Sequence, residues 1–228
     1  MATKLKLGTK NPIYTLAFKA LVFGFFLYIY NSHLGLFWGA VLVLFSFLLY
    51  STPLFNFLSY LPIFLTILTL SLWVGTIGGW IVALSLWLLS LSFGILLGLK
   101  NLYLTNRKYW HYFISFAMSY LLFLNFFLLD KSSLFWLKWL AVIVLLFLLF
   151  KNLLSNNVAS GILALIIGEL LWVVTWLPVG FLSSANLLML SLFFIVDIIA
   201  HQRFSWKNTG LFSLLILLML FSSYWRIG

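Results

Sequence analysis

The chain has 228 residues, of which 65% are hydrophobic and 7% are charged. Soluble globular domains are about 45–50% apolar and about 25% charged, so this composition excludes a soluble domain, a disordered chain and a coiled coil. Thirteen Lys and Arg face three acids, for a net charge of +10, but the basic residues are scattered in short segments and form no nucleic-acid-binding patch.

Apolar runs of helical length follow one another along almost the whole chain. A helix needs about 20 mostly apolar residues to cross a membrane, and Pro, Gly, Asn, Ser and charged residues mark where each run ends. These breaks predict nine membrane-spanning helices, at 13–31, 35–50, 55–73, 77–99, 109–129, 134–150, 158–178, 185–200 and 209–224. Eight spans is the alternative, because the breaks near 31–33 and 75–79 are weak and several runs are short.

We therefore expect an all-α, polytopic integral membrane bundle that forms a single domain over residues 1–228. The loops are too short to hold a soluble domain. The chain contains no cysteine, which excludes disulfides, thiolate metal sites and cysteine nucleophiles. A basic start precedes the first apolar run, but no small-residue cleavage site follows Tyr30, so we expect the first span to be retained.

The basic residues predict a cytoplasmic N-terminus. Lys and Arg are enriched in the cytoplasmic loops of membrane proteins. With the N-terminus inside and nine spans, the outer loops hold only Lys131 and Arg226. The inner loops then hold Lys4, Lys6, Lys10, Lys100, Arg107, Lys108, Lys151, Arg203 and Lys207. We expect the membrane to be a prokaryotic plasma (inner) membrane.

Glu169 is the residue that most needs an explanation. It lies near the midpoint of the expected span 158–178, where insertion scales assign an ionisable group a cost of about 2.5–3.5 kcal/mol. Such a group faces protein or water, finds a partner, or stays protonated. Two interpretations remain open: a carboxylate that couples or binds a proton, cation or ligand, and a protonated Glu that is hydrogen-bonded between helices.

The residues around Glu169 follow helical periodicity. Steps of three and four residues place one set on the face of the acid, namely Ile162, Leu165, Glu169, Trp172 and Trp176. Trp rings beside an acid suit an organic cation through cation–π attraction, but ordinary helix packing is the preferred interpretation of these residues.

Two stripes of small residues predict close helix packing. Small side chains at intervals of four let the backbones of membrane helices approach each other. The first stripe comprises Ser160, Ala164 and Gly168, beside the face that holds Glu169. The second comprises Ser90, Gly94 and Gly98.

Four further polar residues are candidate binding or coupling groups. Asp197 and His201 lie one turn apart near the inner end of a span, so they suit a proton relay or a hydrogen-bonded pair. They are too few for a dedicated metal site. Lys19 and Lys138 lie within spans, where each either pairs with an acid, as Lys19 with Asp197, or extends to the nearer interface.

Two similar apolar runs raise the hypothesis of an inverted repeat. Gly35 and Pro53 bracket the first run, and Gly161 and Pro178 bracket the second. Such a repeat would relate the first four spans to the last four around the fifth, which is common in transporters.

No metalloprotease, serine-hydrolase or phosphate-binding motif occurs, so we expect no catalytic residues, no metal and no cofactor. The leading hypothesis is a small transporter or permease, or the membrane subunit of a transport system, with Glu169 as its coupling group. The alternatives are a non-catalytic scaffold or accessory subunit of a membrane complex and an intramembrane enzyme that acts on a lipid or isoprenoid. The expected partners are membrane lipids and other membrane subunits, and not nucleic acid.

Overall fold

The computed structural model describes eight α-helices and, within the residues it describes, no strand. The described residues are 12–33, 35–52, 56–74, 80–104, 106–128, 135–151, 153–154, 156–177, 179–201, 210, 212–214 and 217. The helices are α1 (Pro12–His33), α2 (Leu36–Ser51), α3 (Phe57–Val74), α4 (Trp80–Lys100), α5 (Arg107–Leu128), α6 (Phe135–Lys151), α7 (Asn157–Thr175) and α8 (Phe181–His201).

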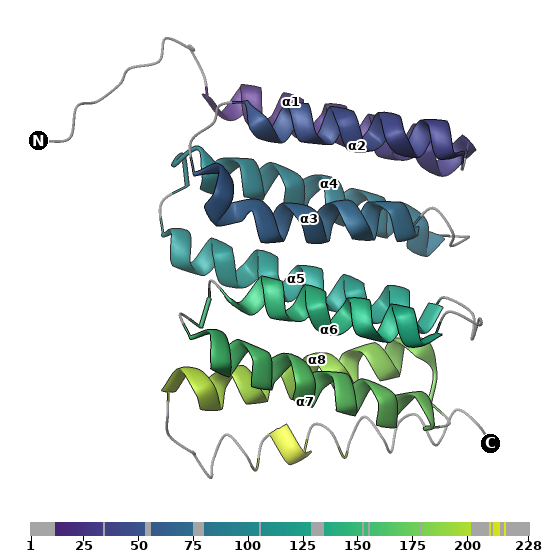
Figure 1. Ribbon diagram of the computed structural model, residues 1–228, viewed down its shortest axis with the longest axis vertical. Coiled ribbons are helices and arrows are strands. Elements are labelled where there is room, and N and C mark those ends of the chain that lie inside the picture. Colours follow the sequence, from purple (N-terminus) through teal and green to yellow (C-terminus); the bar gives the residue numbers. More distant parts are fainter. Residues whose placement is uncertain are drawn as a thin grey trace, which may run out of the picture.

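The helices form two layers of four (Figure 1). One layer contains α2, α3, α6 and α7 in that spatial order, and the other contains α1, α4, α5 and α8. Consecutive helices are antiparallel because short connections join their adjacent ends. One end of the bundle, which we call the basic end, therefore collects Lys100, Arg107, Lys108 and Lys151. We call the opposite end, where α5 and α7 finish and α6 and α8 begin, the aromatic end.

The same ring of helix contacts recurs along the chain. In α1–α4, each helix contacts the next one and α1 also contacts α4, and both α3–α6 and α5–α8 show this pattern. A stacked pair of phenylalanines joins α1 to α4, and another joins α5 to α8. The ring centroids are 4.3 Å apart for Phe23 and Phe93 and 4.2 Å apart for Phe116 and Phe193. The helices thus form a regular two-layer array, which we divide for description into two four-helix units, α1–α4 and α5–α8, with the same orientation.

The protein is a multi-pass helical membrane protein by the length and apolarity of its helices. Six of the described helices are long and apolar enough to cross a membrane. The remaining two, α2 and α6, have 16 and 17 residues, and their lengths of about 24–26 Å fall short of a hydrocarbon core of about 30 Å. The expected count of nine spans is therefore not confirmed, and most of the expected span 209–224 lies outside the described residues.

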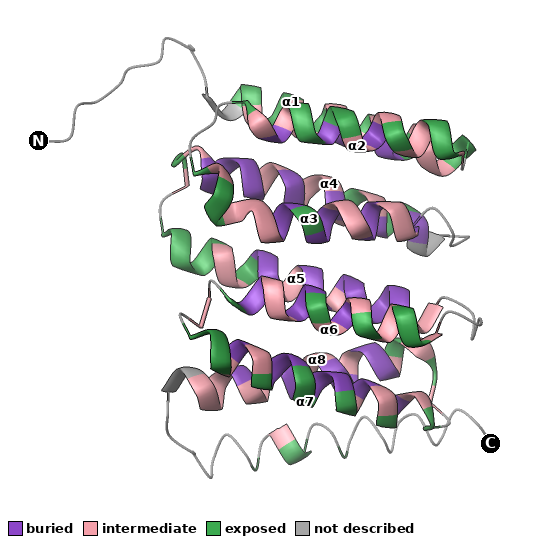
Figure 2. Ribbon diagram, viewed as in Figure 1, coloured by how far each residue is buried: buried purple, intermediate pink, exposed green. Residues whose placement is uncertain are grey.

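The core lies where the two four-helix units meet (Figure 2). In α5, 56% of the most apolar stretch is buried, whereas in α1 the corresponding share is 11%. The helices α3, α4, α5 and α6 provide the contacts between the units. The middle of the array is thus closely covered by protein on most sides, and the outermost helices expose large apolar surfaces.

Helix termini follow local chemistry where the structure describes them. The side chain of Asn156 accepts a hydrogen bond from the N–H of Val158 and so caps the start of α7. The expected start of the following helix at residue 185 is wrong, because α8 already begins at Phe181. Ser184 lies buried within α8, and its N–H donates to the carbonyl of Gly180 over 2.9 Å.

Candidate functional site

Helix α7 packs against α6 through Gly168. A Cβ atom added at Gly168 would lie 2.6 Å from two side-chain carbons of Ile143, so only glycine fits there without a shift of the neighbour. The indole N–H of Trp139 donates to the carbonyl of Gly168 over 2.9 Å. Ser160 and Ala164, the other members of this small-residue stripe, are buried as well. The stripe therefore lies on the protein-facing side of α7.

The face of α7 that carries Glu169 points away from the bundle. Ile162 and Leu165 are 50% and 58% exposed, Trp176 is 76% exposed, and Glu169 itself is exposed. Only Trp172, at the edge of this face, is half-buried. The residues that helical spacing placed together do share a face, and that face lies on the outer surface of α7.

Glu169 lies well inside the length of its helix, and no charged partner for it is found among the described residues. It is six residues before Thr175, which corresponds to about 9 Å along the helix axis. Within the described part of the chain, no hydrogen bond or ion pair is found for its carboxylate. Neither Lys19 nor Lys138 pairs with it there. A carboxylate at this depth stands on an apolar outer surface.

An aromatic cluster joins α6 and α7 near Glu169. The ring of Trp172 stacks on Trp136 with centroids 4.6 Å apart, and it contacts the edge of Phe135 at 5.2 Å. The ring of Trp139 contacts both, with its centroid 6.0 Å from that of Trp136 and 6.4 Å from that of Trp172. Trp172 thus packs between α6 and α7, whereas most of the Trp176 side chain is exposed.

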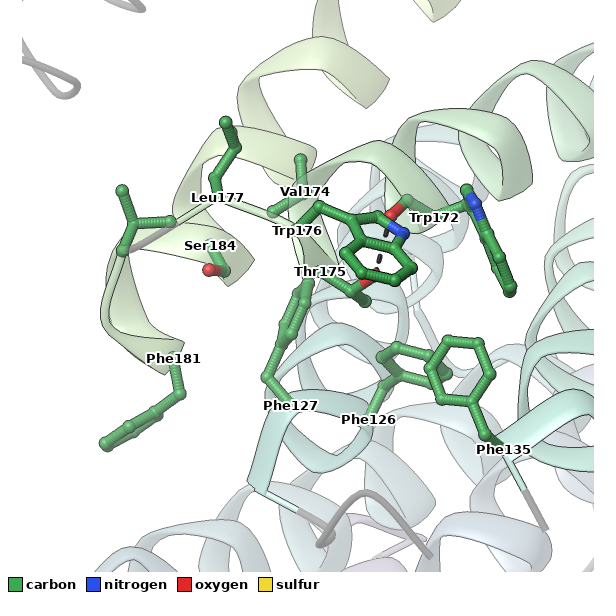
Figure 3. Close-up of a pocket in the computed structure, with 11 residues that line it drawn as sticks. Phe126, Phe127, Phe135, Trp172, Val174, Thr175, Trp176, Leu177, Phe181 and Ser184 are labelled. Carbon is green, nitrogen blue, oxygen red and sulfur yellow. Dashed lines mark hydrogen bonds between the residues drawn. The ribbon is translucent and has the colours of Figure 1, made fainter. Parts of the chain in front are cut away.

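A cavity of about 390 Å³ lies beside this cluster at the aromatic end (Figure 3). All four helices of the second unit contribute to its wall. The lining residues are Phe126, Phe127, Phe135, Trp172, Val174, Thr175, Trp176, Leu177, Val179, Phe181 and Ser184. None of these described residues is charged, and Glu169 is not among them. The cavity is therefore an uncharged, mainly apolar site, separate from the carboxylate.

The second predicted stripe packs α4 against α1. Ser90 donates to the carbonyl of Ala20 over 2.7 Å, and a Cβ atom at Gly94 would lie 3.1 Å from the Cβ of the same alanine. A Cβ atom at Gly98 would lie 3.0 Å from Leu104, which follows α4. The stripe is therefore used within the first unit and contributes no binding surface.

Two lysines converge on the last turn of α2 at the basic end. Lys19 donates to the carbonyl and the hydroxyl of Thr52 over 2.6 and 2.9 Å. Lys100 is 0% exposed, donates to the carbonyl of Tyr50, and lies 4.3 Å from the centroid of the Tyr50 ring. Carbonyls at a helix C-terminus lack intrahelical partners and carry partial negative charge, so both cations stabilise the end of α2.

The other candidate groups are dispersed. Lys19 and Asp197 do not pair, because α1 and α8 lie at opposite ends of the two-layer array. Asp197 and Lys138 are half-buried on α8 and α6. His201 ends α8, and its side chain lies outside the described residues. Among the described residues, no group of three His, Asp or Glu side chains gathers as a metal site would require.

Sequence reasoning missed Lys100 and the cavity. Lys100 reads as one of several loop cations, and nothing in its neighbourhood along the chain signals full burial. The cavity draws its wall from four helices, and no pattern in a single segment predicts which side chains will meet. No family model, no curated protein and no solved structure matches the chain.

Proposed function

We propose that this protein is an accessory subunit of a membrane complex, and that it docks on a membrane-spanning helix of its partner through the outer face of α7. The observation that carries the proposal is the exposed carboxylate of Glu169, about 9 Å inside the helix, among exposed apolar side chains. Ionisable groups within membrane spans characteristically face protein or a water-filled cavity, because hydrocarbon does not solvate them.

The chemistry of the carboxylate defines the partner. A Lys, Arg or His at the matching depth of a partner helix supplies the donor that Glu169 lacks among the described residues, and charge-assisted hydrogen bonds are about twice as strong as neutral ones. Gly161 lies about two turns before Glu169 and about 80° around the helix axis from it, and nothing lies within 4 Å of a Cβ atom placed there. This open position beside the face of Glu169 leaves room for a partner helix.

The same geometry favours docking over transport. A coupling carboxylate must reach the path of its substrate, but Glu169 is not part of the cavity wall. The docking surface also explains why the acid and the apolar residues share one face, since a partner helix covers both together.

Synthetic helices test the proposal directly. We would reconstitute the labelled protein in phosphatidylcholine vesicles with leucine-rich helices of about 22 residues. One helix carries a central Lys and its match carries Leu. Energy transfer is expected only for the Lys helix with the wild-type protein. Glu169→Leu should abolish it, and Glu169→Gln should weaken it because the amide still accepts a hydrogen bond.

Gly161→Leu should weaken energy transfer, because a side chain added beside the docking face keeps the helices apart. Its control is Ala40→Leu, a comparable enlargement on the exposed surface of α2, which should have no effect. Equal binding of the Lys and Leu helices would overturn the proposal. Self-association of the protein that Glu169→Leu removes would also overturn it, since the occupant would then be a second copy.

A further inference from the structure

The cavity at the aromatic end has the composition of a binding site for hydrocarbon. Six of its lining residues are aromatic, namely Phe126, Phe127, Phe135, Trp172, Trp176 and Phe181 (Figure 3). The hydroxyl of Thr175 already donates to the carbonyl of Trp172 over 2.6 Å, so it needs no ligand. The six aromatic rings and the absence of charged residues among the described lining residues favour a neutral, largely apolar occupant.

The position of the cavity selects a chain-like ligand. Its wall comes from the last turns of α5 and α7 and the first turns of α6 and α8, so it lies at the depth where a bilayer leaflet begins. Trp176, in its wall, is 76% exposed, and the cavity therefore extends to the surface of the bundle. A lipid tail can enter here while its head group stays at the membrane surface, near the connection between α7 and α8.

The size of the cavity supports the same conclusion. Protein interiors are packed about as densely as organic crystals, and voids larger than a water molecule are few. A space of about 390 Å³ falls within the range of ligand pockets, about 300–1,000 Å³. In a membrane, hydrocarbon chains surround the bundle and are the species available to fill it.

We propose that this cavity binds the apolar tail of a lipid, an acyl or isoprenoid chain, from the leaflet at the aromatic end. The inference goes beyond the docking function and does not depend on it, because Glu169 is not part of the cavity.

Photo-crosslinking in reconstituted vesicles tests the inference. One arm uses phosphatidylcholine with a diazirine on its acyl chain, and the other uses an isoprenoid alcohol with a diazirine on its tail. Labelling is expected at Phe127, Trp176 and Phe181 in excess of exposed apolar positions such as Leu44 on α2. Labelling by one probe alone identifies the acyl or the isoprenoid chain, and labelling by both shows that any hydrocarbon chain fits.

Filling the cavity should displace the probe. Val179→Trp places an indole in the wall and should reduce labelling of Phe127 and Phe181 about tenfold, the effect of losing room for about two methylene groups. The matched control is Leu182→Trp, at an exposed position outside the wall, which should leave labelling unchanged.

Ser184→Leu fills the cavity from α8 and replaces Val179→Trp if that variant fails to fold as judged by size-exclusion chromatography. Labelling that is equal at the cavity and at Leu44 would overturn the inference. Labelling of Phe127 and Phe181 that persists in a folded cavity-filling variant would overturn it as well.

Discussion

Gly161 and Gly168 lie on the same helix but meet different surroundings. A methyl group at Gly168 would overlap Ile143, whereas a methyl group at Gly161 would meet nothing within 4 Å. The two positions therefore form a matched pair. Replacing glycine by alanine changes the intrinsic helix stability equally at both, so a difference in unfolding free energy between the two variants reports packing.

We expect Gly168→Ala to lower the free energy of unfolding by about 1–3 kcal/mol, because added volume in a closely packed contact forces the neighbour to move. Gly161→Ala should be neutral or stabilising by up to about 1 kcal/mol, since alanine favours the helix. Thermal unfolding in detergent measures both. Combining Gly168→Ala with Ile143→Ala should recover part of the loss, and a strictly additive double variant would contradict the contact.

The surroundings of Lys100 predict how its substitution changes the free energy of unfolding. It is fully buried and donates to the carbonyl of Tyr50 at the end of α2. Lys100→Met should lower the free energy of unfolding by about 1–3 kcal/mol, because this carbonyl then loses its donor. Lys151→Met is the control, since Lys151 is an exposed last residue of α6, and its effect should stay below about 1 kcal/mol. Equal effects of the two substitutions in thermal unfolding would show that burial of Lys100 is irrelevant.

Whether Glu169 faces the interior of the bundle or its outer surface could not be predicted from the sequence. Spacing correctly placed Glu169 with Ile162 and Leu165, but lipid tails and the protein interior are equally apolar, so a membrane helix lacks the polar face that marks the outside of a soluble one. The small-residue stripe through Gly168 was a better guide, because a stripe of that kind indicates a packed side. The outer position of Glu169 follows once that side is known.

Helices were predicted more accurately than their ends. Eight expected spans each overlap one of the described helices, because long apolar runs are unambiguous. The helix ends were predicted less well where the residues used to mark them, such as Ser, also occur inside membrane helices. Ser184 is such a case: its buried position in α8 shows that a serine pair does not by itself end an apolar helix.

The antiparallel order of the helices predicts which connections share a side of the membrane. Because the chain has no cysteine, single cysteines report accessibility without background. Tyr103→Cys lies at the basic end and Gly180→Cys at the aromatic end, and both positions are exposed. With a cytoplasmic basic end, an impermeant maleimide should label Gly180→Cys in intact cells and Tyr103→Cys only after permeabilisation. The reverse pattern would invert the orientation, and labelling of both in intact cells would contradict the topology.

The sequences of α2 and α6 share two short matches. Leu-Phe-Trp occurs at 36–38 and at 134–136, and Phe-Leu-Leu followed by an aromatic residue occurs at 47–50 and at 147–150. The matches are 98 and 100 residues apart, so no single register aligns both. Phe150 also lacks the hydroxyl with which Tyr50 donates to the carbonyl of Phe57. Leu-rich and Phe-rich runs resemble one another everywhere in this chain, so matches of this length do not establish a repeat.

At the scale of the whole molecule, the two four-helix units are joined by contacts as well as by the chain. The helices α3 and α4 of the first unit contact α5 and α6 of the second. A protease site inserted after Tyr103, between α4 and α5, should therefore yield two fragments that stay together through size-exclusion chromatography in mild detergent. Separation of the fragments after cleavage would show that the connection, and not the helix contacts, holds the units together.

The acid on α7 also determines which helices are rejected from its face. Uniformly apolar surfaces in a membrane discriminate poorly, because many hydrophobic helices can replace lipid against them. A helix that covers Glu169 without offering a donor leaves the carboxylate unpaired, as lipid does, whereas a helix with a matching donor forms a charge-assisted hydrogen bond. Discrimination between partners then comes from this difference in affinity. A single glutamate thus converts a permissive surface into a selective one.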